Sequence, residues 1–282
     1  MFRCWIENEY NQKIELTNNR DYKIYRIDGL EPPQAIINTS TVANFDGSRF
    51  NSSRTSERNL VIYLTIEGDC EANRINLYNY IKVKRPLRFY YQNSSRDVYI
   101  DGYVESMPIG FFDMKQAVQI SIICPYPYFK QMDSTILDFV TVTPEFVFPF
   151  AYEQSGKPFS VMEVGAMQSL INGGDVQNGV VITLQASGQA LNPVVYNHTT
   201  GDFFKVGVEM AEGDEIRINT IPGQKGVTQT HDGVVTNIIN KMYTDSTWFQ
   251  LYTGDNIFSY GADKFAENLF CSFTHVNEFE GV

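Results

Sequence analysis

Hydrophobic and polar residues alternate along two neighbouring stretches in the first half of the chain. The first runs from Val98 to Glu105, and after a long turn (Ser106–Lys115) the second places three apolar side chains on one face: Val118, Ile120 and Ile122. Side chains of a β-strand point alternately to the two faces of a sheet, so this spacing of two residues predicts strands. Two such runs this close in sequence predict an antiparallel hairpin.

Two prolines follow this hairpin directly. Proline lacks the N–H group that a sheet needs and keeps the preceding residue extended, so Pro125 and Pro127 predict a stiff exit from the sheet. We therefore expect a domain boundary here, with a first domain of residues 1–130 and a second of residues 131–282. The predicted junction comprises four residues: Cys124, Pro125, Pro127 and Phe129.

The clearest single strand is predicted from Asn59 to Asp69, where apolar residues occupy both faces. Such a strand is expected in the centre of a sheet, where both of its faces are covered. After this strand, the spacing between apolar residues changes from two to three. Within Glu71–Lys82, apolar residues recur at a spacing of three, with one more residue four positions before the last of them, which predicts a short amphipathic helix: Ile75, Leu77, Tyr78 and Ile81.

No apolar face is visible in residues 31–59, which contain two adjacent prolines, three arginines and five serines. Connections inside compact domains usually have about 4 to 6 residues, so a loop this long is expected to be disordered or to be ordered by a partner. Four residues combine aromatic rings with arginines and are the predicted contacts between subunits: Phe45, Arg49, Phe50 and Arg54. A mobile surface loop is the alternative.

From Gly179 onward, short apolar runs alternate with turns such as Pro222–Gly223 and Asp232–Gly233. The runs come roughly every 8 to 12 residues, which is typical of an antiparallel sandwich or barrel. One of them, Trp248–Leu251, carries a tryptophan that is a core residue or, alternatively, a platform for a sugar ring; Trp248 is thus a candidate sugar contact. The predicted fold is mainly β: an N-terminal antiparallel β-sandwich or split barrel with one short helix, followed by a C-terminal β-sandwich.

Charge and cysteine content restrict the possible functions. The 282 residues include 22 basic and 33 acidic side chains, a net charge of −11, which argues against a nucleic-acid-binding surface because phosphate binding needs clustered Lys and Arg. The four cysteines are widely spaced, so we expect neutral or buried thiols and neither a disulfide framework nor a zinc site. Glu7 precedes any apolar run and no stretch approaches the ~20 apolar residues of a membrane span, which predicts a soluble chain made in a cytoplasm.

No catalytic motif is recognisable in the chain. Gly-x-Ser-x-Gly and the phosphate-binding Gly-x-x-x-x-Gly-Lys-Ser/Thr are both absent, and His198, His231 and His275 have no neighbours at the spacing of metal ligands. Carboxylates are densest in residues 209–215, around Gly213. A glycosidase needs two carboxylates that face each other across a sugar, whereas this spacing is typical of a solvated turn. We therefore predict no catalytic residue, no metal, no cofactor and no enzymatic activity.

Several segments together resemble the distal tail proteins of long-tailed bacteriophages with non-contractile tails. The most specific is residues 119–129, where a strand runs into Cys-Pro-x-Pro-Tyr-Phe. The other segments follow in the same order along the chain as in the family: Asp46–Phe50, the strand after Arg58–Asn59, Gly102–Ser106, Asn192–Pro193, Gly213–Asp214 leading into Ile218–Thr220, and Glu280–Val282.

The resemblance implies an N-terminal domain that forms a hexameric ring, single or stacked with a second ring, and a C-terminal domain similar to galectins. It implies a structural hub of the virion tail tip, assembled in the host cytoplasm, through whose lumen DNA passes. Expected partners are the major tail protein, the tape measure protein, a tail-associated lysin or fibre protein and receptor-binding or baseplate proteins. Neither sequence-specific DNA binding nor membrane insertion is expected. The alternative function is a carbohydrate-binding module that recognises host surface polysaccharide.

Overall fold

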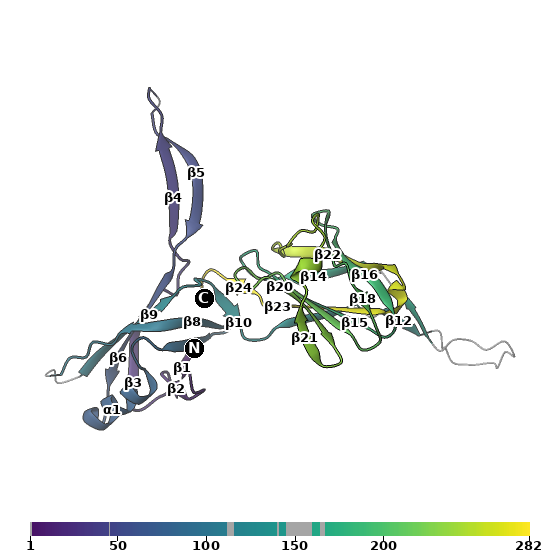
Figure 1. The fold of residues 1–282 in the computed structure, drawn as a ribbon. Coiled ribbons are helices and arrows are strands. Elements are labelled where there is room, and N and C mark those ends of the chain that lie inside the picture. The colour runs from purple at the N-terminus through teal and green to yellow at the C-terminus, as the bar shows by residue number, and fades with distance from the viewer. Residues whose placement is uncertain (1, 45, 112–115, 140, 145–159, 164–166) are drawn as a thin grey trace. The chain divides into compact units, whose positions relative to one another are not determined.

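The computed structural model describes residues 2–44, 46–111, 116–139, 141–144, 160–163 and 167–282. The chain folds into two compact units (Figure 1). Unit 1 comprises Met1–Met132 together with Glu278–Val282, and unit 2 comprises Asp133–Asn277. The predicted domains placed residues 278–282 in the second domain; this assignment is wrong, because the chain returns to unit 1 after Asn277 and adds its last strand there.

Unit 1 is a mostly antiparallel β structure with one α-helix among its described residues. Its elements are β1 (Arg3–Asn8), β2 (Lys13–Glu15), β3 (Tyr22–Asp28), β4 (Ala35–Thr41), β5 (Ser48–Thr55), β6 (Arg58–Ile66), α1 (Cys70–Tyr80), β7 (Pro86–Gln92), β8 (Asp97–Ser106), β9 (Gln116–Cys124), β10 (Phe129–Gln131) and β24 (Glu278–Phe279). The main sheet has the order β2-β1-β7-β8-β9-β6-β3, β10 joins β8, and β24 joins β10. Strands β4 and β5 form a separate two-stranded sheet.

The predicted hairpin is present as β8 and β9, which pair antiparallel. The apolar face of β9 meets that of β6, since Ile120 lies opposite Ile62 and Ile122 lies opposite Leu60, and all four side chains are buried. Gly102 allows β8 to approach β9 closely, because a Cβ atom at this position would lie 2.5 Å from the Cγ2 atom of Ile122. Burying each of these aliphatic side chains contributes roughly 1.5–3 kcal/mol.

Two details of the unit 1 prediction are wrong. Strand β6 is not central, because only β3 separates it from the edge of the sheet, and the side chains of its second face are half-buried. Helix α1 begins after Asp69, whose Oδ1 accepts a hydrogen bond from the Ala72 N–H at 3.2 Å. Of the predicted apolar residues, Leu77 and Ile81 are buried as expected, whereas Ile75 and Tyr78 are exposed, so the buried face of the helix is narrower than predicted.

Unit 2 is a β-sandwich. Its elements are β11 (Thr135–Asp138), β12 (Thr141–Pro144), β13 (Ser160–Glu163), β14 (Gln168–Asn172), β15 (Val181–Ala186), β16 (Ala190–Asn197), β17 (Asp202–Lys205), β18 (Glu209–Met210), β19 (Glu215–Asn219), β20 (Gly226–His231), β21 (Val234–Asn237), η1 (Ile239–Lys241), β22 (Gly254–Lys264), η2 (Ala266–Asn268) and β23 (Leu269–His275). One sheet has the order β11-β23-β15-β19-β20-β21. The other has the order β14-β22-β16-β17, with β18 beside β16.

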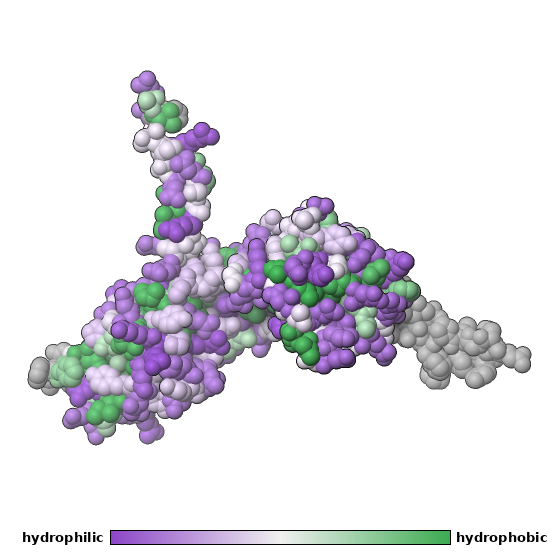
Figure 2. Space-filling view, viewed as in Figure 1, coloured by the Kyte–Doolittle hydropathy of each residue, from purple (hydrophilic) through white to green (hydrophobic). Residues whose placement is uncertain are grey.

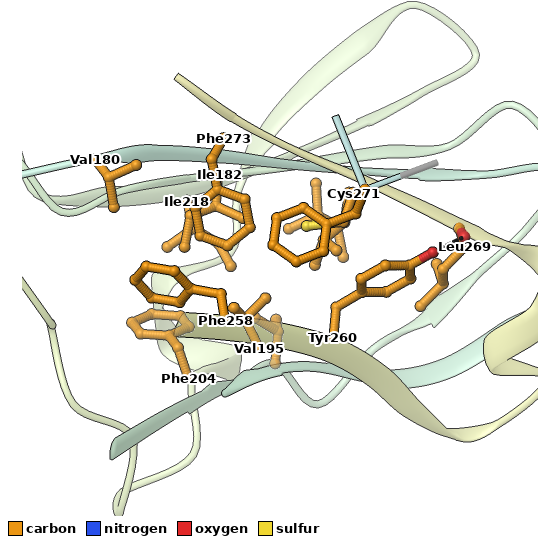
Figure 3. Close-up of a cluster of buried hydrophobic side chains, with 14 of the residues drawn as sticks. Val180, Ile182, Val195, Phe204, Ile218, Phe258, Tyr260, Leu269, Cys271 and Phe273 are labelled. Carbon is orange, nitrogen blue, oxygen red and sulfur yellow. Dashed lines mark hydrogen bonds between the residues drawn. The ribbon is translucent and has the colours of Figure 1, made fainter. Parts of the chain in front are cut away.

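The core of unit 2 lies between these two sheets (Figure 3). Phe258 and Phe204 from one sheet point toward Ile182 and Phe273 from the other, and all four are fully buried. The rings of Phe258 and Phe273 lie 4.8 Å apart between centroids. The prediction of a mainly β fold with a C-terminal sandwich is confirmed. The predicted strand Trp248–Leu251 is wrong, since only Leu251 forms an isolated bridge, to Asn178.

In the described part of the chain, no helix is long and apolar enough to cross a membrane.

Candidate assembly surfaces

We define the arm as β4, β5 and the residues between them, and its described residues are exposed or partly exposed along its length. All residues of β4 are exposed, and in β5 only Thr55 is partly covered. Polar side chains bond across the two strands, with Asn38 donating to Ser52 at 3.0 Å and Ser40 donating to Asn51 at 3.3 Å. A two-stranded hairpin is at best marginally stable in water. We therefore expect a partner surface to complete the arm.

Apolar side chains lie uncovered on the arm. Ile37 is 55% exposed and Phe50 is 60% exposed, and Figure 2 shows hydrophobic residues along it in green. Of the predicted subunit contacts, Arg49, Phe50 and Arg54 all lie exposed on β5, whereas Phe45 lies outside the described residues. The prediction of a loop without regular structure is wrong. The segment is a hairpin whose pattern shows no buried face, because unit 1 does not cover either side of it.

Arg58 lies buried where the arm meets the main sheet, and its guanidinium donates to backbone carbonyls from distant parts of unit 1. The Nε group donates to Pro127 at 2.6 Å, and the terminal nitrogens donate to three more carbonyls: Gly29 at 2.5 Å, Glu31 at 2.6 Å and Glu280 at 2.5 Å. The guanidinium carbon also lies 4.6 Å from the centroid of the Phe129 ring. We call these groups the Arg58 cluster.

The sequence pattern placed Arg58 at the end of the loop of residues 31–59, which shows no apolar face, but its side chain is part of the interior of unit 1. The residue is 3% exposed. Burial lowers its pKa, but an arginine stays protonated at neutral pH. Carbonyl oxygens are polar acceptors without a proton to lose, so four of them satisfy the buried cation without a carboxylate partner.

The C-terminal tail, Glu278–Val282, binds along unit 1. β24 pairs with β10, and the Tyr126 hydroxyl donates to Glu278 Oε2 at 2.5 Å. Burial raises the pKa of Glu278, although the bond from Tyr126 opposes this shift. Arg96 donates to the Gly281 carbonyl and lies over the Phe279 ring, 4.3 Å from its centroid. The tail therefore completes unit 1, although it follows all of unit 2 in the sequence.

The predicted junction residues all belong to unit 1. Cys124 ends β9 and is buried, which raises the pKa of its thiol to about 12 and keeps it neutral. Phe129 begins β10 and is fully buried against Arg58. Pro125 and Pro127 connect two strands of one sheet rather than two domains. The chain passes between the units twice, after Met132 and after Asn277.

Unit 2 contains an acidic groove of about 670 Å³ between β18 and the β20–β21 hairpin. The groove is lined by Gln189, Glu209, Met210, Ala211, Glu212, Asp214, Gln229, His231, Thr236 and Ile238. Asp214 is buried and accepts three hydrogen bonds: from the Ala211 N–H at 3.0 Å, Gln229 Nε2 at 3.1 Å and His231 Nδ1 at 2.6 Å. Glu209 and Glu212 are exposed as predicted, although Glu209 begins β18 and only Glu212 lies in the turn, whereas Asp214 is buried.

The His231–Asp214 pair predicts a measurable titration. The hydrogen bond from His231 and the charge of Asp214 raise the pKa of His231, and Asp232 adds to this shift. A raised pKa means that folding favours the imidazolium; this stabilisation is complete below pH 6.5 and disappears as the pH rises through the raised pKa. Burial opposes ionisation of Asp214, but its hydrogen bonds outweigh burial and lower its pKa, so its contribution disappears only toward acid pH.

We expect an NMR titration of the imidazole protons to place the pKa of His231 above 6.5 in the folded protein, and Asp214→Asn to bring it down toward that value. Asp232→Asn serves as the control and should lower the pKa by less, because Asp232 lies 3.6 Å from Nε2 and the Asp214 oxygen lies 2.6 Å from Nδ1. An unchanged titration in Asp214→Asn contradicts the pairing.

Trp248 is partly buried and packs against the core of unit 2. Its ring meets Phe204 at a centroid distance of 4.8 Å, and the Lys225 ammonium lies 5.8 Å from its centroid. These contacts are those of a residue at the edge of the core, and the role of Trp248 as a sugar contact stays a prediction. Among the described residues, no group of three or more His, Cys, Asp and Glu side chains is placed to hold a metal ion.

Family comparisons agree over both units. Residues 11–124 match the phage tail protein RIFT-related domain, and residues 173–276 match the C-terminal domain of the siphovirus-type tail component. The chain belongs to the siphovirus-type tail component family. The resemblance to the distal tail proteins of non-contractile phages is thus confirmed, and the chain is a structural component of a phage tail. No curated protein sequence matches the chain.

Solved structures share the fold of this tail component over its full length. The Dit protein of phage SPP1, described as a paradigm of the hub adsorption apparatus in phages that infect Gram-positive hosts, has 14% sequence identity and a TM-score of 0.70, over 98% of this chain and 99% of that one. A chain of the phage P2 baseplate, activated with Ca, has 12% identity and a TM-score of 0.55 over 100% of both chains. A chain of the same baseplate activated with Sr has 11% sequence identity and a TM-score of 0.55.

The acidity of this tail component is concentrated in one unit. Unit 1 carries basic and acidic residues in almost equal numbers, so nearly all of the net charge of −11 belongs to unit 2. The net charge of the whole chain therefore does not describe unit 1, the domain that was predicted to form a ring. Counting acidic and basic residues separately in the predicted domains, residues 1–130 and 131–282, shows the same difference in net charge from the sequence alone.

Proposed function

We propose that the chain is the hub of a siphophage tail tip, in which six copies form a ring through unit 1. The arm of each copy contacts the neighbouring copy, and the ring joins the tail tube to a fibre or lysin protein and to receptor-binding proteins, with DNA passing through the lumen. The proposed role is structural and needs no catalytic residue.

One observation carries this proposal: a hairpin with uncovered apolar side chains and exposed arginines in an otherwise well-packed unit. Apolar residues left uncovered on one element mark a surface that binds another protein. The hub role of the SPP1 protein, which shares the fold, supports the same conclusion. The near balance of charge in unit 1 is compatible with a channel that does not hold DNA through clustered basic residues.

Deleting the arm tests the proposal. Ser56 donates to the Gln34 carbonyl through its N–H at 3.0 Å and its hydroxyl at 2.9 Å, so the two residues already lie together at the base of the arm. Replacing residues 35–55 with an Asn-Gly turn should therefore leave the fold intact. We expect native mass spectrometry to show six-membered rings for the complete chain and single copies for the deletion.

Point variants separate a lost contact from a lost fold. Phe50→Ser should weaken ring formation, whereas Ile75→Ser, at an exposed apolar residue of α1, should leave it unchanged. Both variants should keep the thermal transition of the original chain because neither side chain is buried. Rings that persist after deletion of the arm contradict the role of the arm, and a complete chain that stays monomeric at high concentration contradicts the hub.

A further inference from the structure

Strand β21 forms an open edge of the unit 2 sandwich. It is the last strand of its sheet among the described residues, and all four of its residues are exposed. It is held to β20 by a tight turn at Asp232 and Gly233, whose φ angles of +48° and +76° are those of a two-residue hairpin. Val234 is 65% exposed and Val235 is 66% exposed, and Figure 2 shows a hydrophobic patch over this strand.

The backbone of β21 offers hydrogen-bonding groups to another strand. The Ile238 N–H donates to Val227 on β20, and the Val234 position pairs with His231 next to the turn. Because backbone groups alternate in direction along an antiparallel strand, the N–H and C=O groups of Val235 and Asn237 point to the open side. Charged residues, prolines and bulges commonly protect such edges, and β21 contains none of them.

The acidic groove opens beside this edge. Thr236 of β21 lines it, and Gln229 lies directly opposite Thr236 on β20, so both residues share the groove face. Across the groove lie the exposed carboxylates Glu209 and Glu212. Their negative charge is part of the excess that unit 2 carries, so a cationic ligand suits the groove.

We propose that β21 and the acidic groove bind an extended, basic segment of a partner protein. The segment adds to β21 as a further strand through the open backbone groups of Val235 and Asn237. Since alternate side chains of an added strand share one face, Lys or Arg residues at a spacing of two reach toward the groove. Polysaccharide suits the groove less well because the described residues that line it include no Trp, Tyr or Phe on which a sugar ring could stack.

Two synthetic probes test the proposal on the complete protein: the peptide Thr-Lys-Val-Lys-Val-Lys-Val-Lys-Thr with blocked ends, and the same peptide with Glu in place of Lys. Fluorescence anisotropy should show the lysine peptide binding at least about tenfold more tightly at low salt, with the difference shrinking as salt increases. Hydrogen exchange should slow at the amides of Val235 and Asn237. It should not change at Val234 and Thr236, whose amides already face β20.

Matched variants separate the contribution of the β21 backbone to peptide binding from that of the groove carboxylates. Val235→Pro removes an outward N–H without removing a bond to β20 and should abolish binding, whereas Val235→Thr keeps that N–H and should bind normally. Glu209→Gln combined with Glu212→Gln should reduce the preference for lysine and leave the exchange protection in place. Absence of binding by the lysine peptide, or binding without protection at Val235 and Asn237, overturns the proposal. Protection of groove residues by dextran but not by the peptide overturns it in favour of a sugar site.

Discussion

Replacing Arg58 with alanine should lower the free energy of unfolding of unit 1 by about 3–5 kcal/mol. The change leaves four carbonyl oxygens without their donor, and these come from the segment before the arm, the segment between β9 and β10, and the C-terminal tail. Hydrogen bonds to a charged group each contribute about 1.5–3 kcal/mol, and water entering the space left by the side chain recovers part of this loss. Denaturant unfolding followed by tyrosine fluorescence measures the effect.

Arg54→Ala is the matched control. Arg54 lies on the exposed arm, so the stability of unit 1 should change by less than about 0.5 kcal/mol. Arg58→Lys should also destabilise unit 1, because an ammonium group has three donors at one point and does not reach carbonyls on several sides. If Arg58→Ala unfolds at the same denaturant concentration as Arg54→Ala, the cluster does not stabilise the unit.

Ending the chain after Asn277 should destabilise unit 1 and leave unit 2 almost unchanged. The residues removed follow unit 2 in sequence, yet their contacts are with unit 1. Truncation removes an acceptor of Arg58, the bond between Tyr126 and Glu278, and the Phe279 ring beside Arg96. We expect a loss of about 3 kcal/mol or more in unit 1. Hydrogen exchange resolved by segment should show faster exchange in β8 and β10.

Phe273→Ala is the control for this truncation, because it should destabilise unit 2 and leave unit 1 unchanged. Its ring is fully buried in the core of unit 2, so the substitution should cost unit 2 about 3–5 kcal/mol and leave exchange in unit 1 unchanged. A truncated chain in which unit 2 loses protection while unit 1 keeps it would show that the tail belongs to the sandwich.

The double crossing of the chain changes the role of the two prolines. The sequence predicted that Pro125 and Pro127 stiffen the exit from the first domain at the boundary with the second. They lie instead between β9 and β10, and the Pro127 carbonyl accepts from Arg58. Their replacement by glycine should therefore act first on the stability of unit 1, through the greater freedom of the unfolded chain.

The sequence by itself determined the β8–β9 hairpin, strand β6, the mainly β fold and the family. Apolar residues at a spacing of two identified the buried faces of residues 118–122 and 60–66, because this spacing is a local property of a strand. In the structure these two strands, β9 and β6, pair with each other. Arg49, Phe50 and Arg54 are exposed, which their segment without an apolar face indicated, and their contact with another subunit stays a prediction. Their pairing into a hairpin was missed because a strand exposed on both faces has no buried face to detect.

Only the tertiary structure decided the position of Arg58, the C-terminal tail and Asp214. Arg58 and Glu280 are separated by 222 residues, and the pattern around either residue is that of a polar surface. Asp214 resembles its solvated neighbours in sequence and differs from them only because His231 and Gln229 fold over it. The position of β21 as the last strand of its sheet among the described residues likewise depends on which strands lie beside it. These features result from contacts between distant segments, which the local period of a sequence does not specify.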